Sequence, residues 1–418
     1  MSRPLSLALY GLATGLLEPF APAILRRRAR RGKEAPARLA ERLGRASLAR
    51  PPGSLVWLHG VSVGETTSLL PLVFALRARR PDLALLVTSG TVTAAELLAR
   101  RLPPGVIHQF APVDGPRAVG RFLDHWRPAL GVFVESELWP NLILGARRGG
   151  VRLALASARI TEASARRWRG WPGAARTLLA AFDPILPQDT ASAGRLESLG
   201  GACGPRLNLK RVGEALPADP EALRRLREIV NGRRVVVAAS THPGEETLVA
   251  EAFRQAVPDP AEKAILIVIP RHPERGADVA TALGADRRST GAAPAGPIHV
   301  ADTLGELGLF FRLADVVVMG GGFVDGVGGH NPLEPARLGK PILTGPHVFN
   351  AQDLYAELEA EAAAIVAHDA RDLARHIRGL LDNARIARRI GEAALDYAAR
   401  QSAALDDALA RLEHLLPA

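Results

Sequence analysis

The sequence has little of two residue types that often reveal a protein's chemistry. One of its 418 residues is a cysteine, Cys203, and aromatic residues make up 5%. A single cysteine excludes a disulfide framework and a thiolate metal cluster, and it is typical of a reducing compartment. The scarcity of aromatics disfavours a nucleic-acid-binding surface. Hydrophobic residues reach 47% and charged residues 23%, so the chain is globular and long enough for two domains.

One common catalytic motif is also missing. There is no G-x-x-x-x-G-K-[ST], which excludes a P-loop ATPase. The histidines at positions 242, 272, 330 and 347 are scattered and lack metal-site spacing. We therefore expect no metal ion, and we expect these histidines to have structural or substrate-contact roles.

Positive charge is unevenly distributed along the chain. The net charge is +10, and residues 1–50 contain eleven Lys and Arg against three Asp and Glu, which places +8 of it there. An excess of basic over acidic residues usually indicates an anionic partner, either nucleic acid or a membrane surface. Since the remaining chain is nearly neutral, we expect an anionic membrane surface and no nucleic acid.

The N-terminal segment supports the membrane interpretation. Residues 5–25 are strongly apolar, interrupted by Glu18, Pro19 and Pro22, and RRRARRGK follows directly. The run is long enough to span a bilayer, but its carboxylate and prolines favour a helix that lies in the interface, held by the basic residues. A cleaved signal peptide would have its charges in front, and a core helix with a basic tail remains a fourth interpretation. Except for the signal peptide, these interpretations leave the body in the cytoplasm.

The rest of the chain alternates short apolar runs with helical patterns, which predicts parallel sheets with crossover helices. Strands are expected at residues 55–59, 83–88, 106–110, 130–134 and 152–156, and again at 234–239, 265–269, 298–301, 316–319 and 341–343. The pattern of residues 385–416 predicts one or two amphipathic helices. The expected fold is α/β, with two Rossmann-like, doubly wound domains that face each other across a cleft. The predicted division is a membrane-associating segment at 1–35, domains at 36–205 and 221–395, a linker at 206–220 and a C-terminal helix at 396–418.

Carboxylates follow two strands of the first half. Glu65 stands in WLHGVSVGET, where a strand ends and a helix begins, so it is either a helix cap or a general base. Glu135 and Glu137 stand in GVFVESELWPNL, at the end of a buried strand. They are either solvated carboxylates at a helix start or functional groups, because burying an unpaired carboxylate is costly.

Three segments of the second half suit an anion. STHPGEE and PRHPER each follow a strand and precede a helix, and Arg271 offers a guanidinium to a phosphate. The Gly-rich segment 319–350 leads into a helix start at Asn331 and Pro332, where Glu334 could bind ribose hydroxyls. Gly-rich loops in this position commonly cradle phosphates. The alternative for each is a strand-to-helix turn without a ligand.

Taken in order, VSVGE, ESELWPN, ARIT, STHPGEE, PRHPER and GGHNPLEP resemble the bacterial Kdo transferases of lipopolysaccharide assembly. These enzymes transfer 3-deoxy-D-manno-octulosonic acid (Kdo) from CMP-Kdo to the lipid A precursor. The resemblance covers nearly the whole chain. It implies a GT-B glycosyltransferase at the cytoplasmic side of the inner membrane, with the lipid acceptor on the first domain and CMP-Kdo on the second. It also implies an inverting reaction by direct displacement, without a metal or a cofactor.

The resemblance assigns roles to particular residues. Glu65 corresponds to the general base, and Glu135 and Lys210 correspond to groups that stabilise the transition state. The contacts to CMP map to Pro270, Arg271, Leu304, Gly305, Glu306, Asn331, Pro332, Leu333 and Glu334. The alternatives are another GT-B transferase or epimerase, which the first-half motifs disfavour, and a non-catalytic scaffold, which would have lost Glu65 and Glu135.

Overall fold

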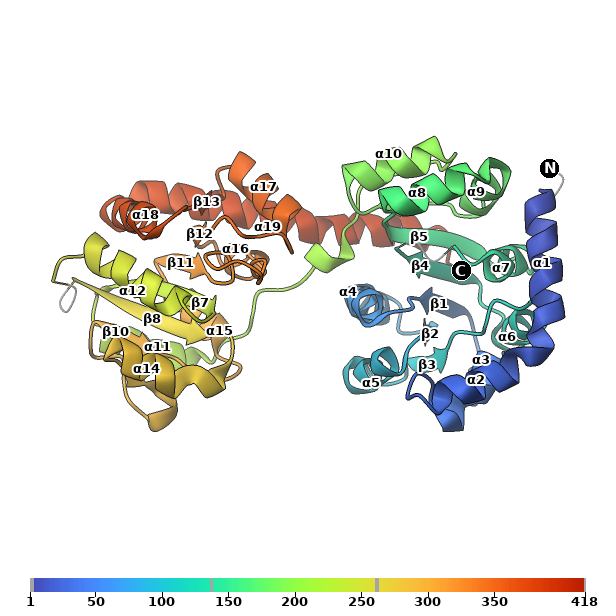
Figure 1. The fold of residues 1–418 in the computed structure, drawn as a ribbon, viewed down its shortest axis with the longest axis horizontal. Helices are drawn as coiled ribbons and strands as arrows, with labels where there is room; N and C mark the ends of the chain where they lie inside the picture. Colours follow the sequence, from blue (N-terminus) through green and yellow to red (C-terminus); the bar gives the residue numbers. More distant parts are fainter. Residues whose placement is uncertain (1–3, 136–137, 260–262, 417–418) are drawn as a thin grey trace. The chain divides into compact units, whose positions relative to one another are not determined.

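The protein consists of two compact units, each built on one parallel β-sheet (Figure 1). The structure is a computed structural model that describes residues 4–135, 138–259 and 263–416. The first unit comprises residues 1–213 together with 401–418, and the second comprises residues 214–400. The division falls after Gly213, within the segment predicted as a linker.

The first sheet has six strands in the order β3-β2-β1-β4-β5-β6, and its neighbouring strands are parallel. The strands are β1 (Leu55–His59), β2 (Ala84–Ser89), β3 (Ile107–Phe110), β4 (Leu130–Val134), β5 (Arg152–Ala158) and β6 (Ile185–Pro187). The strand order reverses between β1 and β4. Loops that leave these two strands diverge, which makes the carboxyl ends of β1 and β4 the switch point at which ligands bind in such folds.

Helices cover both faces of this sheet (Figure 1). They are α4 (Val63–Arg79), α5 (Val92–Arg101), α6 (Pro116–Trp126), α7 (Pro140–Arg148), α8 (Glu162–Arg169), α9 (Pro172–Leu179), α10 (Thr190–Ser198) and the 3-10 turn η3 (Leu209–Arg211). One core lies between the sheet and α4 and α5, and the other lies under α6 to α10. The strands are buried on both faces, which explains their continuous Val, Leu and Ile runs.

The apolar N-terminus forms α1 (Leu5–Leu17), η1 (Glu18–Phe20) and α2 (Ala21–Ala29). Together, Leu5–Ala29 are long and apolar enough to cross a membrane. In the structure, however, one side of the segment is buried against the first unit through Leu7 and Leu25. The buried carboxylate of Glu18 accepts the N–H groups of Arg117 (2.9 Å) and Ala118 (2.6 Å), and so caps α6. This capping satisfies orphan donors of α6 and ties the bend between α1 and α2 to the unit.

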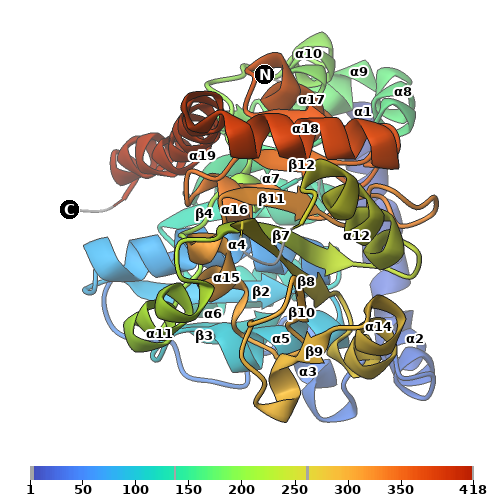
Figure 2. The same ribbon diagram turned by 90° about the vertical axis from the view of Figure 1, so that its left-hand side faces the viewer.

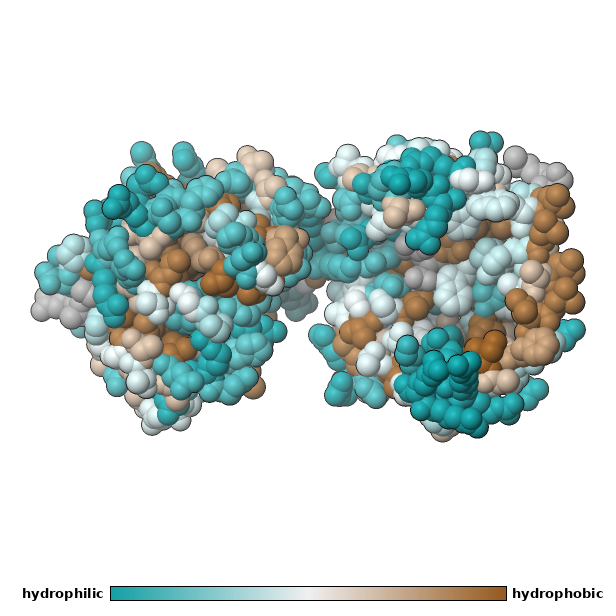
Figure 3. All heavy atoms as spheres, viewed as in Figure 1, coloured by the Kyte–Doolittle hydropathy of each residue, from teal (hydrophilic) through white to brown (hydrophobic). Residues whose placement is uncertain are grey.

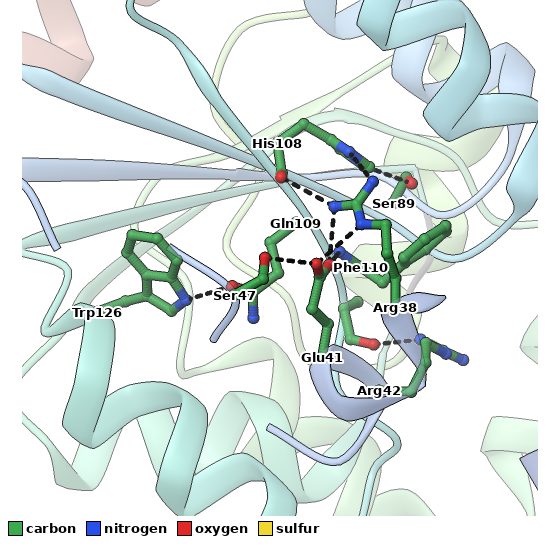
Figure 4. A network of polar contacts seen from close by, with 10 residues as sticks. Arg38, Glu41, Arg42, Ser47, Ser89, His108, Gln109, Phe110 and Trp126 are labelled. Carbon is green, nitrogen blue, oxygen red and sulfur yellow. Dashed lines mark hydrogen bonds and ion pairs between the residues drawn. The ribbon is translucent and has the colours of Figure 1, made fainter. Parts of the chain in front are cut away.

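The basic segment that follows is joined to β3 by a buried polar network (Figure 4). It contains η2 (Pro36–Arg38) and α3 (Leu39–Arg42). The Glu41 carboxylate accepts two N–H groups of Arg38 and the backbone N–H of Phe110, each at 2.8 Å, and the Ser47 hydroxyl at 2.7 Å. Burial, and then the charge of Arg38, lower the pKa of His108 to about 4. Part of the N-terminal positive charge is therefore internal and structural.

The second sheet has seven strands in the order β13-β12-β11-β7-β8-β10-β9, also with parallel neighbours. The strands are β7 (Arg234–Thr241), β8 (Ala264–Pro270), β9 (Asp286–Arg287), β10 (Ile298–Val300), β11 (Val316–Met319), β12 (Ile342–Thr344) and β13 (Ala364–Val366). Here the order reverses between β7 and β11, so the loops that follow these strands form the second switch point.

Figure 2 shows α12 and α14 on one side of this sheet and α11 and α15 on the other. The helices and 3-10 turns are α11 (Pro220–Val230), α12 (Glu245–Ala256), η4 (Pro273–Arg275), α14 (Gly276–Leu283), η5 (Arg288–Thr290), α15 (Leu307–Leu313), α16 (Leu333–Ala336), α17 (Gln352–Ala360), α18 (Ala370–Asp382) and α19 (Ala384–Glu413). Both faces of the sheet carry an apolar core, as in the first unit.

Every strand expected from the sequence is present, with ends shifted by at most two residues, so the α/β prediction is confirmed. The strands that the sequence did not reveal are β6, β9 and β13, which have two or three residues each and lie at sheet edges. An edge strand needs few apolar residues, and its short run resembles a turn. The prediction of a separate C-terminal helix from residue 396 is wrong, because α19 runs unbroken from Ala384 to Glu413.

Candidate active site

The first switch point brings Glu65 close to the end of β4. Gly60 follows β1, and a Cβ atom at this position would lie 3.2 Å from Glu65 Cβ and 3.2 Å from Val134 Cγ2. Glu135 is the next residue after Val134. The carboxylates that the sequence singled out on separate segments therefore start from neighbouring positions at one sheet edge.

Glu65 lies in the first turn of α4, where it forms a variant of the capping box with Ser62, in which the carboxylate reaches the N–H of Val61 and not that of the N-cap. Its carboxylate accepts the backbone N–H of Val61 and the hydroxyl of Ser62, each at 2.7 Å, while its own N–H donates to Ser62 Oγ at 3.3 Å. The residue is 8% exposed. The interpretation of Glu65 as a helix cap is thus confirmed. It does not exclude a second role, because each carboxylate oxygen has a further lone pair.

Glu135 and Lys210 form an ion pair. Lys210 Nζ lies 2.5 Å from Glu135 Oε1, and their side chains are 42% and 16% exposed. Glu135 has a φ of 57°, an uncommon conformation for a residue with a side chain, which turns the backbone sharply at the end of β4. Lys210 is positioned by η3, where the Leu209 N–H donates to Ser157 Oγ at the end of β5. Glu137, the other carboxylate of this motif, lies outside the described residues.

At the second switch point, the end of β7 touches the start of the loop after β11. A Cβ atom on Gly320 would lie 2.5 Å from the carbonyl oxygen of Ser240, so the backbones pack directly. Ser240 has a φ of 59°, and the pairing of β7 with β8 shifts register next to it. His242 follows this strained end of β7, and its ring meets that of His330 in the loop after β11.

Pro270 ends β8, and Arg271 follows it at the same sheet edge. The Arg271 N–H donates to the Thr241 carbonyl at 3.0 Å, which holds the backbone beside β7, and the side chain is exposed. Its neighbour His272 places its ring 6.1 Å from that of His242, edge to face. Arg271 is thus available to an anion at the switch point.

The predicted CMP contacts at 304–306 stand on an exposed turn before α15. Leu304 is 84% exposed, and Gly305 has a φ of +83°, which favours glycine. The Glu306 carboxylate accepts Arg288 Nε at 2.6 Å and the Thr303 hydroxyl. The Arg288 guanidinium, above all, lowers the pKa of Glu306. Since its charge is already paired, Glu306 is better suited to shaping the turn than to binding a phosphate.

Asn331, Pro332, Leu333 and Glu334 begin the short helix α16, which has four residues, and Pro332 is its N-cap rather than its first residue. The Asn331 side chain accepts the Leu333 N–H at 3.1 Å. Burial raises the pKa of Glu334. Glu334 is half-buried, and its carboxylate is thereby less readily ionised than that of an exposed glutamate.

The Gly-rich loop after β11 differs from the sequence expectation. The buried carboxylate of Glu245 accepts the N–H groups of Gly321 (2.7 Å) and Phe323 (2.9 Å), and also that of His242 (2.9 Å). Backbone donors that the sequence assigned to a phosphate cradle are thus occupied by an internal carboxylate. The reason is tertiary, because the fold brings the start of α12 under this loop.

Sequence reasoning missed one feature of this site. His242 and His330 stand 88 positions apart and were treated as scattered, but their Nε2 atoms lie 2.8 Å apart. The signal available in the sequence is that each follows a strand that flanks the switch point. No group of three or more His, Cys, Asp or Glu that could hold a metal ion is found among the described residues.

Comparisons with known proteins identify the family. The family model for 3-deoxy-D-manno-octulosonic-acid transferase (kdotransferase) matches residues 37–211. The chain is 36% identical to the 3-deoxy-D-manno-octulosonic acid transferase of Bordetella pertussis over 435 aligned residues, covering 97% of this chain and 99% of that protein.

Among solved structures, a glycosyltransferase from Rickettsia africae matches with a TM-score of 0.55, 10% identity and coverage of 87% and 99%. A UDP-GlcNAc 2-epimerase from Neisseria meningitidis matches with a TM-score of 0.54, 10% identity and coverage of 87% and 100%. The GT-B fold is therefore shown, but it is shared by transferases and epimerases, and the sequence relationship decides between them. The chain belongs to the 3-deoxy-D-manno-octulosonic acid transferase family and is a glycosyltransferase.

Proposed function

We propose that this protein transfers Kdo from CMP-Kdo to a hydroxyl of the lipid A precursor lipid IVA, at the cytoplasmic face of the inner membrane. The observation that carries the proposal is the first switch point. There, a buried glutamate at a helix start lies beside a strand end that holds a Glu–Lys ion pair. One group can accept a proton and the other can stabilise charge.

In the proposed reaction, Glu65 is the general base. The acceptor hydroxyl forms a bond to the anomeric carbon of Kdo, the bond from that carbon to the CMP phosphate oxygen breaks, and the hydroxyl proton passes to Glu65. A single displacement inverts the anomeric configuration and needs no covalent intermediate. The capping box supports this role, because the Val61 N–H and the Ser62 hydroxyl fix the carboxylate in place and leave lone pairs for the acceptor.

Lys210 is proposed to stabilise the charge that develops in the transition state. Glu135 holds the ammonium group by the 2.5 Å ion pair, while 42% of the lysine side chain stays exposed. An ammonium has three donors, so the pair leaves donors for an oxygen that gains negative charge. Glu135 would thus act mainly by positioning Lys210.

The second unit is proposed to bind CMP-Kdo at its own switch point, without a metal or a cofactor. The exposed guanidinium of Arg271 and the nearby histidines offer positive charge or N–H donors to the phosphate. Pro270, the 304–306 turn and residues 331–334 lie after strands of the same sheet. Activity that persists after treatment with a chelator would support the metal-free part of the proposal.

The α1–α2 segment supports a lipid acceptor and attachment in the plane of the interface. Figure 3 shows a brown, apolar surface along α1. The most exposed large side chains of the α1–α2 segment are Leu5, Leu9, Leu12, Leu16, Leu17, Phe20 and Ile24, with exposures of 55–75%. The opposite side is buried against the first unit, which favours a helix that lies in the interface over one that spans. The exposed basic residues that follow would face anionic headgroups.

A cavity of about 550 Å³ lies beneath this segment, within the first unit. Its lining includes Leu17, Ile24 and Arg28 of the segment and Val61 and Thr91 of the strand-end loops. Since Val61 donates its N–H to Glu65, the cavity extends from the apolar surface toward the proposed base. This continuity suits a lipid whose head must reach Glu65.

The test is a transfer assay. The 418-residue chain is incubated with CMP-Kdo and lipid IVA in vesicles that contain anionic phospholipid, and the lipid product is identified by its mass. We expect Glu65→Gln to reduce turnover by about 10²- to 10⁴-fold, because the amide keeps the capping box but cannot accept the proton. Glu96→Gln, on an exposed face of α5, is the matched control and should retain full activity.

The assay has three outcomes against the proposal. Lack of a Kdo-extended lipid with the unaltered chain would reject the transfer itself. Full turnover of Glu65→Gln would reject the base. A chain that stays in the supernatant when the vesicles are sedimented would reject attachment to the membrane surface.

A further inference from the structure

His242 and His330 form a close imidazole pair at the switch point of the second unit. Their Nε2 atoms lie 2.8 Å apart, and the rings are nearly parallel, with an interplanar angle of 13° and centroids 5.1 Å apart. Both side chains are half-buried, so the pair is accessible at its rim. The ring of His330 packs on Gly321, where a Cβ atom would lie 3.0 Å from its Cδ2 atom. The packing therefore holds the two rings in a fixed arrangement.

The contact fixes how many protons the pair can carry. Two Nε2 atoms at hydrogen-bond distance share one proton, since one nitrogen must donate and the other must accept. Burial lowers the pKa of both rings, and the positive neighbours lower that of His330 further, to about 4. At neutral pH the free pair is therefore uncharged, with one N–H directed at the other ring.

The groups around the pair are mainly positive or already bound. Arg271 and His272 face it from the loop after β8, and they act on the pKa of both rings. On α12, Glu245 is bound by three backbone N–H groups. Glu246 is paired with Arg275 at 2.7 Å and with the Thr241 hydroxyl at 3.1 Å. An oxyanion placed here would meet donors and cations.

We propose that the His242–His330 pair is an oxyanion site of the donor substrate, which opens and takes up one proton when the anion binds. The proposal rests on the proposed function, since it names a contact of the CMP-Kdo site. On binding, the hydrogen bond between the rings breaks, and the accepting Nε2 gains a proton from the solvent. Each ring then donates one N–H to the oxyanion, and the gained positive charge balances its negative charge.

Because anion binding is coupled to the uptake of a proton, the affinity for the anion depends on pH in a predictable direction. The bound anion raises the pKa of the pair above its value in the free protein, so the complex holds more protons than its parts. The affinity for the anion is therefore greatest below the pKa of the free pair and falls as the pH rises from that value through the pKa of the bound pair. A pair with only a structural role would not couple binding to a proton.

CMP-Kdo carries two oxyanions that could occupy the site, the phosphodiester and the carboxylate of the sugar acid. Both accept two N–H donors, so the pair fits either one. CMP, which has the phosphate but no sugar carboxylate, separates the two sources. If the phosphate occupies the site, a substitution in the pair weakens CMP and CMP-Kdo alike. If the carboxylate does, only CMP-Kdo is weakened.

The experiment is calorimetric titration of the 418-residue chain with CMP-Kdo, in two buffers of different ionisation enthalpy at the same pH. We expect uptake of about one proton per CMP-Kdo bound. In His330→Gln, whose amide reaches the same position but cannot be protonated, the uptake should disappear, and the affinity should fall about tenfold to a hundredfold. His368→Gln, at an exposed histidine of the same unit, is the control and should match the unaltered protein.

The failures are distinguishable. If the unaltered chain binds CMP-Kdo without proton uptake, or if His330→Gln binds it equally well, the oxyanion site is rejected while the proposed function stands. If the unaltered chain does not bind CMP-Kdo at all, the proposed function fails first. Should His330→Gln lose its circular dichroism signal, His242→Gln tests the pair from the other loop, with the same expected loss of uptake.

Discussion

The two switch points share a topology and differ in chemistry. In the first, the segments that follow β1 and β4 carry the carboxylates of Glu65 and Glu135, and the histidine of β1, His59, is fully buried within the unit. In the second, the segments that follow β7 and β11 present half-buried imidazoles from His242 and His330. A doubly wound sheet thus supplies the position of a site, while the residues that follow its strands give each site its own chemical groups.

The largest expected effect tests whether chemistry belongs to the first switch point alone. Lys210→Met keeps the stem of the side chain and removes its charge, so turnover should fall about a hundredfold. Binding of CMP-Kdo, measured by calorimetry, should stay unchanged. Lys263→Met, at an exposed lysine, serves as the control. If Lys210→Met weakened donor binding as much as turnover, Lys210 would belong to donor recognition, and the contrast between the two units would break.

The next prediction compares the glycines beside the switch points. A Cβ atom on Gly320 would lie 2.5 Å from a backbone oxygen, whereas one on Gly60 would meet only side-chain atoms, each at 3.2 Å. Because a backbone cannot yield as a side chain can, Gly320→Ala should destabilise its unit by about 3 kcal/mol, and Gly60→Ala by less than about 1 kcal/mol.

Intrinsic fluorescence separates the two cases. All five tryptophans lie between residues 57 and 171, in the first unit. Gly320→Ala should therefore lower the thermal midpoint in circular dichroism while the transition in tryptophan fluorescence stays in place. Equal destabilisation by both substitutions would show that the two switch points are packed alike.

The smallest expected effect concerns the buried histidine. Burial, and then the charge of Arg42, lower the pKa of His59 to about 3, below the value of about 6.5 for an unfolded histidine. The unfolded chain thus binds an extra proton between these values, and stability is lost as the pH falls through this window. A glutamine at this position does not titrate. When the pH is lowered from 7.5 to 5, the difference in unfolding free energy between His59→Gln and the unaltered protein should therefore shift by about 2 kcal/mol in favour of the variant.

Urea unfolding followed by tryptophan fluorescence measures this prediction in the first unit. The His59 Nδ1 atom lies 2.8 Å from the Thr88 hydroxyl, so a constant packing cost is expected at both values of pH. A relative stability that does not change with pH would mean that His59 becomes protonated in the folded unit. The contrast between a buried and an accessible switch-point histidine would then be lost.

The sequence predicted the sheets well because buried parallel strands leave continuous apolar runs. The positions of Glu65, Glu135 and Arg271 after strands were also predicted from the sequence, since each follows such a run and the carboxyl ends of parallel strands meet at one edge. Pairings between distant segments could not be predicted. The contact of His242 with His330 and the capture of loop N–H groups by Glu245 depend on how β7, β11 and α12 meet in the folded unit.

Helix α19 has a consequence for the order in which the protein is made. Its residues Ala394 and Tyr397 lie in a core of the second unit, whereas Leu405, Leu409 and Leu412 pack with Val56 and Leu58 of β1. The strands of the first unit leave the ribosome first, but the core between the sheet and α4 and α5 stays incomplete until the second unit has been synthesised. The unit that is translated first is therefore completed last, and a protease that cuts α19 would weaken both units at once.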